Sequence, residues 1–207
     1  LTVYGNVDVQ GTVTVNALSG AFNAIGAGST IRGSIENVNV LGTYTVTGPL
    51  NIANDLLVQG TGGDLAVADQ SVVIGRDLLL LSAGTVTMTN GAGVMTIGRN
   101  ANFRGGSTAG RLTAGRMDVA GNIAQDNSGC ACAASNPSFS PSGSHVTRLT
   151  GTGTQNIDIF NTGTGATLSH FADLDLSAKT GAVDQVRFNT TYVEGNLISN
   201  PAVAPAT

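Results

Sequence analysis

The chain has 207 residues, of which 41% are apolar and only 11% are charged, and its formal net charge is −4. Disordered chains are rich in charge and poor in apolar residues, so this composition excludes disorder and requires a surface of Thr, Ser, Asn and Gly. The sequence has no basic run and only 4% aromatic residues, which argues against nucleic-acid binding. No apolar stretch approaches the roughly 20 residues of a membrane helix, so membrane insertion is not expected.

Short alternating segments begin at the first residue, where LTVYGNVDVQG places valines at positions 3, 7 and 9. Comparable alternation over four to six residues, interrupted by Gly or Asn, continues along the chain, and such a period of two predicts short strands. No window keeps the apolar spacing of an amphipathic helix. The expected fold class is therefore all-β.

One phrase returns at a nearly constant interval. The segments LNIANDLLVQG, VVIGRDLLLLS and MTIGRNANFRG begin at Leu50, Val72 and Met95, which are 22 and 23 residues apart, and weaker copies begin at Leu1 and Leu112. A strand-containing unit of this length cannot bury its own apolar side, and stacking neighbouring units buries it. The repeat predicts a single-stranded parallel β-helix (a β-solenoid), right-handed, with about 22 residues per coil.

In such a solenoid each coil lies on the previous one, so equivalent side chains stack on one another. The expected inward ladder consists of Ile52, Ile74 and Ile97. Gly75 and Gly98 are expected to stack at one corner. The arginines that follow these glycines would stack outside it and repel each other, unless the nearby aspartates intervene.

The composition and periodicity of the sequence change after about residue 120. We expect regular coils over 1–125, an excursion loop rich in Ser, Asn, Gly and Pro over 126–145, further coils over 146–199, and a Pro/Ala tail or linker over 200–207. A loop of that length is uncommon in a compact domain unless it has a function. A host-binding module on this loop is one hypothesis.

The two cysteines, Cys130 and Cys132, are separated by a single residue. This spacing is too short for the usual zinc-binding pairs, which have two to four intervening residues. A disulfide within Cys-Ala-Cys, a bond to another chain and two free thiols all remain open. No metal and no cofactor is expected.

Only two histidines are present, and one of them lies near two carboxylates. His170 precedes Asp173 and Asp175, which occupy alternate positions of one expected strand and form the alternative site of a hydrolase. The simpler interpretation is that both carboxylates face water while Leu174 and Leu176 face the core. We therefore expect no catalytic residue and no enzymatic activity.

Two segments of the sequence suggest further classes of ligand. The segment GTGGDLAVAD at 60–69 is an imperfect single copy of a calcium-binding repeat, which by itself cannot build a stacked site. Thr-x-Thr segments at 12–14, 43–47 and 85–89 suggest an ice-binding surface, but the distances between them are not multiples of the coil length. Threonine is more simply a strand former on a hydrated face.

The segments FSPSGSHVTRLTGTGTQNI (139–157), FNTG (160–163) and SHFADLDLS (169–177) resemble parts of large repetitive surface proteins of bacteria. These are haemagglutinin-like or adhesin-like exoproteins, and VYGNVDV and VEGNLIS near the two ends are similar in style. The resemblance implies a parallel β-helix, export from a bacterial cell, and an extended structural or adhesive role. It implies no catalytic residue.

The expected function is that of a structural or adhesive rod, either secreted or on the cell surface. Its expected partners are a second copy joined head to tail, as in a filament, or flanking segments of a giant surface protein, together with a host or cell-surface ligand. The main alternative is a carbohydrate-active solenoid enzyme, either a polysaccharide hydrolase or a lyase. The lesser alternative is an ice-binding solenoid.

Overall fold

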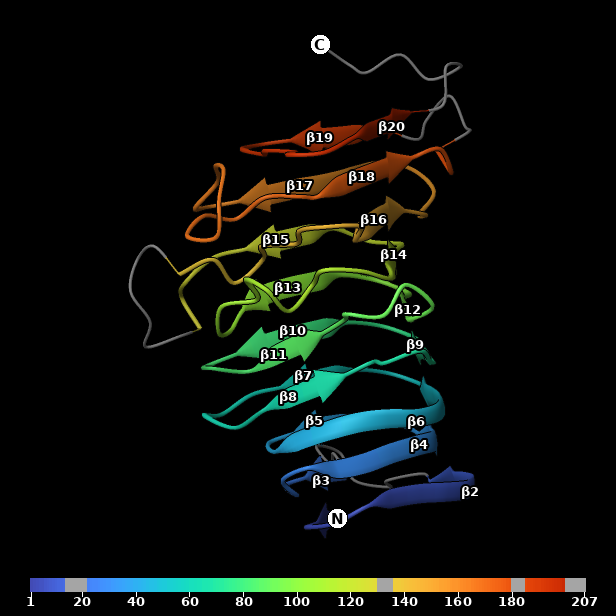
Figure 1. Cartoon of the computed structure of the whole chain (residues 1–207). Helices are drawn as coiled ribbons and strands as arrows, with labels where there is room; N and C mark the ends of the chain where they lie inside the picture. The colour runs from blue at the N-terminus through green and yellow to red at the C-terminus, as the bar shows by residue number, and fades with distance from the viewer. Residues whose placement is uncertain (14–21, 130–135, 180–184, 200–207) are drawn as a thin grey trace.

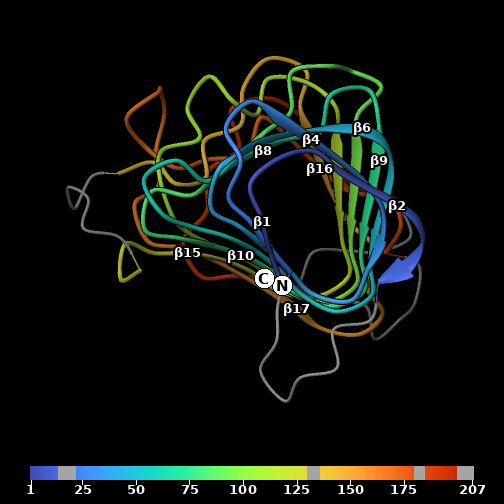
Figure 2. The same ribbon diagram turned by 90° about the horizontal axis from the view of Figure 1, so that it is seen from below.

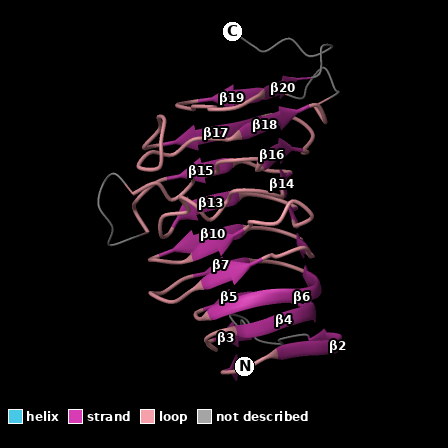
Figure 3. Ribbon diagram, viewed as in Figure 1, coloured by secondary structure: helices cyan, strands magenta, loops and turns pink. Residues whose placement is uncertain are grey.

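The structure is a computed structural model that describes residues 1–13, 22–129, 136–179 and 185–199. In these ranges it is all-β and contains no helix (Figure 3). Successive strands form rungs that stack from the N-terminal end to the C-terminal end (Figure 1). All strand pairs are parallel, so the predicted parallel β-solenoid is confirmed. Within the same ranges there is no helix that could cross a membrane.

Most of the strands are short, as expected for segments that are interrupted by Gly and Asn. They are β1 (Thr2–Val3), β2 (Val7–Val13), β3 (Phe22–Ala24), β4 (Ser29–Ile35), β5 (Val38–Val40), β6 (Thr43–Ile52), β7 (Leu56–Val58), β8 (Asp64–Ala66), β9 (Ser71–Ile74), β10 (Leu78–Leu81), β11 (Thr85–Thr87), β12 (Val94–Ile97), β13 (Ala101–Arg104), β14 (Arg116–Val119), β15 (Ile123–Gln125), β16 (Val146–Leu149), β17 (Gln155–Ile159), β18 (Asp173–Leu176), β19 (Val186–Phe188) and β20 (Leu197–Ser199).

Two sheets enclose the core. The first has nine strands in the order β1-β3-β5-β7-β10-β13-β15-β17-β19, and the second has the order β11-β8-β6-β9-β12-β14-β16-β18-β20, with β2 and β4 beside it. Strand β6 bends between two faces: its first half pairs with β8 and its second half with β9. The second sheet therefore divides above β6, and the view along the axis shows strands on three sides of a closed section (Figure 2).

The length of a coil varies along the axis. Residues that stack directly are 16 and 18 positions apart in early rungs, 22 and 23 apart in the middle rungs, and 34 and 31 apart in the last ones. The predicted repeat of about 22 residues therefore describes the middle of the solenoid. The last coils are longer because segments are inserted between the two sheets.

The core is built of side chains that stack on their counterparts in the next coil. Ile52 pairs with Ile74, Ile74 with Ile97, and all three are fully buried. The same inward column of the second sheet continues through Val119 and Leu149. An inward column of the first sheet contains Val38, Leu56, Leu78, Ala101, Ile123 and Ile157. The residues of the expected core ladder are thus brought together in one column.

A glycine is required at the corner after the isoleucine column. A Cβ atom on Gly75 would lie 2.1 Å from the carbonyl oxygen of Ala53, and one on Gly98 would lie 2.3 Å from the carbonyl oxygen of Gly75. Neither glycine has a positive φ, so close approach of the backbones is the reason for the residue type. Gly75 and Gly98 stack, as the sequence suggests.

A ladder of Asn and Asp side chains lines the corner where the chain enters the first sheet. In each step a side-chain oxygen accepts a hydrogen bond from the backbone N–H of the equivalent residue one coil further along, at 2.8–3.4 Å. The members of this corner ladder are Asn37, Asp55, Asp77, Asn100, Asn122 and Asn156. Such bonds satisfy N–H groups that the strands do not pair.

The inserted segments of the last coils return to the core. The expected excursion loop over 126–145 includes residues that are fully buried, among them Phe139 and His145. Phe139 stacks between Phe103 and Phe171, with ring centroids 4.5 and 4.9 Å apart. The later part of this segment thus belongs to the coil itself, because it supplies the core residue that a strand would otherwise provide.

Replacing Ile74 by Ala is expected to lower the free energy of unfolding by about 2–5 kcal/mol, because the column above and below cannot close the cavity. The matched control is Val73→Ala in the same strand. Val73 is 39% exposed and faces outward, so its loss is expected to remain below about 1 kcal/mol. Urea denaturation followed by circular dichroism measures both, and equal losses would contradict the inward column.

Asp77 provides a test of the corner ladder. Its carboxylate accepts the N–H of Asn100 at 2.9 Å and pairs with Arg99. Asp77→Asn keeps an acceptor oxygen and loses only a surface ion pair, so a loss below about 1 kcal/mol is expected. Asp77→Ala leaves the N–H of Asn100 without its acceptor, so a loss of about 1–3 kcal/mol is expected. If denaturation curves show that Asp77→Asn loses as much stability as Asp77→Ala, the proposed role of Asp77 in the corner ladder is refuted.

Candidate functional site

The three residues of the alternative hydrolase site lie close in sequence but hold different partners. Asp173 and Asp175 are in β18 and flank the fully buried Leu174, so both carboxylates lie on the outer face of the strand. His170 is 98% buried and precedes that strand. Its imidazole contacts Glu194, a residue that the sequence did not single out.

Both aspartates accept hydrogen bonds from backbone N–H groups. Asp173 Oδ1 accepts hydrogen bonds from the backbone N–H of Asn196 at 2.7 Å and from its amide nitrogen at 3.1 Å, one coil further along. Asp175 Oδ1 accepts the N–H of Ser177 at 2.8 Å, which closes the turn after the strand. Asp173 therefore accepts a backbone N–H of the next coil in the second sheet, as the members of the corner ladder do beside the first sheet.

His170 and Glu194 border a small cavity of about 80 Å³. Nδ1 of His170 lies 3.0 Å from the carbonyl oxygen of Leu168, and Nε2 lies 3.5 Å from Oε2 of Glu194. The other carboxylate oxygen of Glu194 accepts the N–H of Gly165 at 2.6 Å. The cavity lining is otherwise made of small residues: Ala109, Gly110, Ser140, Ser142, Gly165 and Ala166.

The position of Glu194 near His170 could have been predicted from the sequence. Phe171 pairs with Val193 in an isolated bridge, so the residues beside them, His170 and Glu194, lie in neighbouring coils. A separation of 24 residues is close to one coil. Ser140 and Ser142 are reached through the inserted segment of the preceding coil, which follows no regular spacing.

The second histidine, His145, lies inside the core. Its Nδ1 donates to the carbonyl oxygen of Ala114 at 2.9 Å, whereas its Nε2 is buried and has no hydrogen-bond partner in the part of the chain that the structure describes. Burial lowers the pKa of His145, and the hydrogen bond to Ala114 opposes this only in part. The imidazole is therefore neutral near neutral pH.

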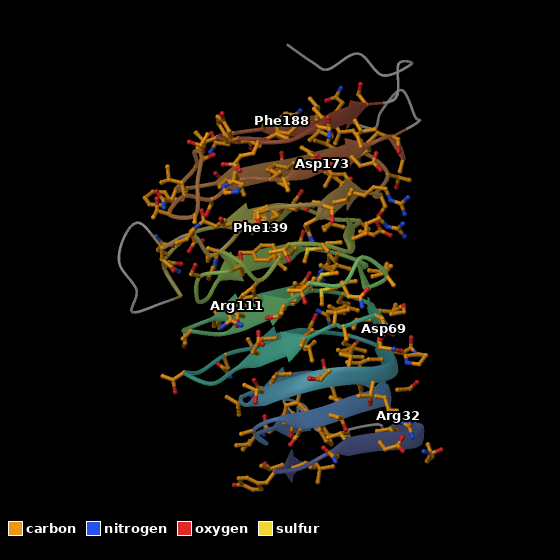
Figure 4. All side chains as sticks on the ribbon, in the orientation of Figure 1. Arg32, Asp69, Arg111, Phe139, Asp173 and Phe188 are labelled. Carbon is orange, nitrogen blue, oxygen red and sulfur yellow. The ribbon has the colours of Figure 1, made fainter. Side chains whose placement is uncertain are left out.

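Arginines and aspartates alternate between neighbouring coils on the outer surface. Arg76 Nε lies 3.6 Å from Asp55, and Arg99 pairs with Asp77, so the two arginines that would otherwise stack are each matched by an acid one coil below. The same arrangement joins Arg32 to Asp8 and Arg148 to Asp118, whereas Arg104 pairs with Asp126, which follows it in the chain. Arg32 points away from the ribbon in Figure 4. Hydrogen bonding to Arg99 lowers the pKa of Asp77, against the opposing effect of burial.

The residues considered for calcium and for ice contact one another. Thr43 and Thr85 do not stack directly, because Asp64 lies between them in register. Asp64 accepts the hydroxyl hydrogens of Thr85 at 2.8 Å and Thr87 at 3.0 Å, and Arg111 lies 3.3 Å away. An arginine thus balances the charge of this carboxylate, and no unbroken threonine ladder forms on this face.

Some predicted residues fall outside the described ranges. These are Thr14 of the first Thr-x-Thr segment, Cys130, Cys132 and the tail at 200–207. Within residues 1–13, 22–129, 136–179 and 185–199, no group of three or more His, Cys, Asp and Glu side chains gathers in a way that could hold a metal ion.

The last described rung exposes side chains that are inward-facing elsewhere. Phe188 in β19 (labelled in Figure 4) stacks on Ile157, and Leu197 in β20 stacks on Leu174. Phe188 is nevertheless 42% exposed and Leu197 57% exposed. Tyr192, beside them in the same coil, is also exposed. At the first rung Leu1 and Tyr4 are exposed as well.

The chain was compared with models of protein families, with curated proteins and with solved structures, and none of these comparisons gives a match.

The buried His145 predicts a stability that depends on pH. The pKa of a histidine is about 6.5 in an unfolded chain and is lower here in the folded one. Between these two values the unfolded state binds more protons, so the free energy of unfolding rises with pH and falls on acidification below about pH 6.5.

Denaturant titrations of the wild type and of His145→Gln, from about pH 7.5 to pH 5, measure this dependence. The wild type is expected to lose more stability on acidification than the variant does. Identical pH profiles would show that the protonation of His145 is not linked to folding.

Proposed function

We propose that the chain is a structural or adhesive rod that acts outside the cell, without catalysis, and that it extends through further coils of the same design. These coils belong to a second copy joined head to tail or to flanking segments of a longer surface protein. The observation that carries the proposal is the continuous parallel stacking of rungs, whose first and last described rungs carry exposed apolar side chains.

The stacked core supports a mechanical role. Each rung is joined to its neighbours by parallel backbone ladders and by inward columns such as Ile52–Ile74–Ile97. In such a solenoid stability is roughly a sum of the rungs and their interfaces, so adding rungs lengthens the rod without altering its interior. Bending would require these columns to slip or separate.

The surface supports a role in a hydrated exterior. The charges are few, and several arginines pair with an acid of a neighbouring coil, while the sequence is rich in Thr, Asn and Ser. This arrangement and the resemblance to large bacterial surface proteins agree with a secreted or surface-bound location.

The last described rung supports extension. In the described part of the chain no strand pairs with the outer edge of β19 or β20, so within those residues each edge is open to another strand. Open edges of this kind are templates for a further strand. Another rung would cover Phe188 and Leu197 and continue their columns. Head-to-tail contact of this type does not close on itself, so it produces filaments.

Sedimentation and electron microscopy of the purified chain at increasing concentration test this proposal. We expect elongated particles that grow end to end. Leu197→Asp is expected to shorten them, because a carboxylate would have to be buried in the extended column.

The matched control is Ile198→Asn, since an aspartate at this position would stack on the carboxylate of Asp175. Ile198 neighbours Leu197 in β20 but stacks on Asp175 of the outer face, so this variant is expected to assemble as the wild type does. Circular dichroism checks that both variants fold. Discrete particles of constant length at every concentration, or equal effects of the two substitutions, would contradict extension through this rung.

A further inference from the structure

We propose that Asn90 is a site of spontaneous deamidation, and that the isoaspartate formed there loosens the attachment of the next coil. This covalent modification needs only water and is separate from the proposed role of the rod. Asn90 and Gly91 are the only Asn-Gly pair in the sequence. They lie in the turn between β11 and β12, where both residues are exposed.

The turn places the side-chain amide of Asn90 beside the nitrogen that attacks it. Oδ1 of Asn90 accepts a hydrogen bond from the backbone N–H of Ala92 at 2.9 Å. An asparagine that bonds the N–H two residues further along folds over the intervening peptide, so its amide carbon Cγ lies next to the nitrogen of Gly91. The N–H of Ala92 also stabilises the negative charge that develops on Oδ1 during the attack.

The reaction balances with water as the only other reactant. The nitrogen of Gly91 gives its proton to the solvent and forms a bond to Cγ of Asn90, while the Cγ–Nδ2 bond breaks and the amide nitrogen leaves as ammonia. The product is a cyclic imide, a succinimide. Water then adds to one of its carbonyl carbons, and the bond from that carbon to the ring nitrogen breaks. Addition at Cγ gives aspartate, whereas addition at the main-chain carbonyl carbon gives isoaspartate.

Gly91 leaves the attacking nitrogen accessible. A Cβ atom on this residue would meet no atom within 4 Å apart from those of its chain neighbours, and its φ is not positive. The fold therefore does not require a glycine here. A glycine nonetheless has more backbone freedom than any other residue, which allows its nitrogen to turn toward Cγ of Asn90. An alanine would fit the turn but restrict this movement.

Asparagines of the corner ladder direct their side chains elsewhere. Oδ1 of Asn100 accepts the N–H of Asn122 at 3.0 Å, and Oδ1 of Asn122 accepts the N–H of Asn156 at 2.8 Å. These oxygens bond to the next coil, so the side chains are not folded over the peptide that follows them. Asn122 is exposed, as Asn90 is, but it precedes the β-branched Ile123. Exposure alone therefore does not distinguish Asn90.

The next coil packs directly on this turn. The carbonyl oxygen of Asn90 accepts the N–H of Gly93 at 3.1 Å, and that of Gly93 accepts the N–H of Arg116, the first residue of β14, at 3.0 Å. A Cβ atom on Gly115 would lie 2.9 Å from the Asn90 oxygen and 2.7 Å from the Gly93 oxygen, so the two backbones are close. Isoaspartate brings its Cβ into the main chain and lengthens the turn, which displaces these carbonyl groups.

Incubation of the folded chain at neutral and at mildly alkaline pH, followed by peptide mass spectrometry, tests the proposal. We expect Asn90 to gain the mass by which a carboxylic acid exceeds an amide, while Asn100 and Asn122 stay unmodified. The reaction is expected to be faster at alkaline pH, because the attacking nitrogen must lose its proton. Enzymatic methylation of isoaspartate identifies this product. Aged protein is expected to melt at a lower temperature than fresh protein.

Gly91→Ala is expected to slow the modification severalfold. Asn90→Ser is expected to abolish it, since a serine hydroxyl can still accept the N–H of Ala92 but carries no amide. Asn90→Asp is the control for charge, because it adds a carboxylate without lengthening the main chain, and fresh samples of this variant are expected to melt as the wild type does. Circular dichroism checks the fold of each variant.

Three results would overturn the proposal. Modification of Asn100 or Asn122 at the same rate as Asn90 would show that the turn does not select its asparagine. An undiminished rate in the Gly91→Ala variant would refute attack by the nitrogen of this residue. Aged chains that contain isoaspartate at position 90 but melt as fresh chains do would refute its effect on the next coil.

Discussion

The constraint on which the structure depends is that the strands of each rung lie parallel on those of the rung below, so that side chains in register rest on their counterparts about 4.8 Å away. For apolar side chains this contact is favourable, and the interior therefore repeats Ile, Val and Leu in columns. For like charges it is unfavourable. On the outer surface arginines and aspartates therefore alternate between coils, and Arg76 and Arg99 each pair with an aspartate of the coil below.

The same constraint explains where the solenoid can vary. At the corner that leads into the first sheet, each Asn or Asp oxygen must meet the N–H of the next coil, and the strands that follow keep their register over nine rungs. On the way from the first sheet to the second, extra residues are inserted between β15 and β16. Phe139 belongs to this inserted part, and the His170–Glu194 cavity lies between it and the links before β18 and β20.

Extension depends on the regular part of the design, because an open rung with exposed Phe188 and Leu197 can be covered only by a rung with the same spacing. The contact of His170 with Glu194 belongs to the links between the sheets, where side chains of nonequivalent positions meet.

The sequence by itself determined the parallel solenoid and the column of Ile52, Ile74 and Ile97, because both follow from a local period of two and a coil repeat of 22 and 23 residues. The outward position of Asp173 and Asp175 followed from the same alternation. Only the tertiary structure decided that Asp173 supports Asn196, that Phe139 completes the core and that Glu194 faces His170. The physical reason is that these contacts join neighbouring coils, and the long, irregular insertions hide from the sequence which residues lie above one another.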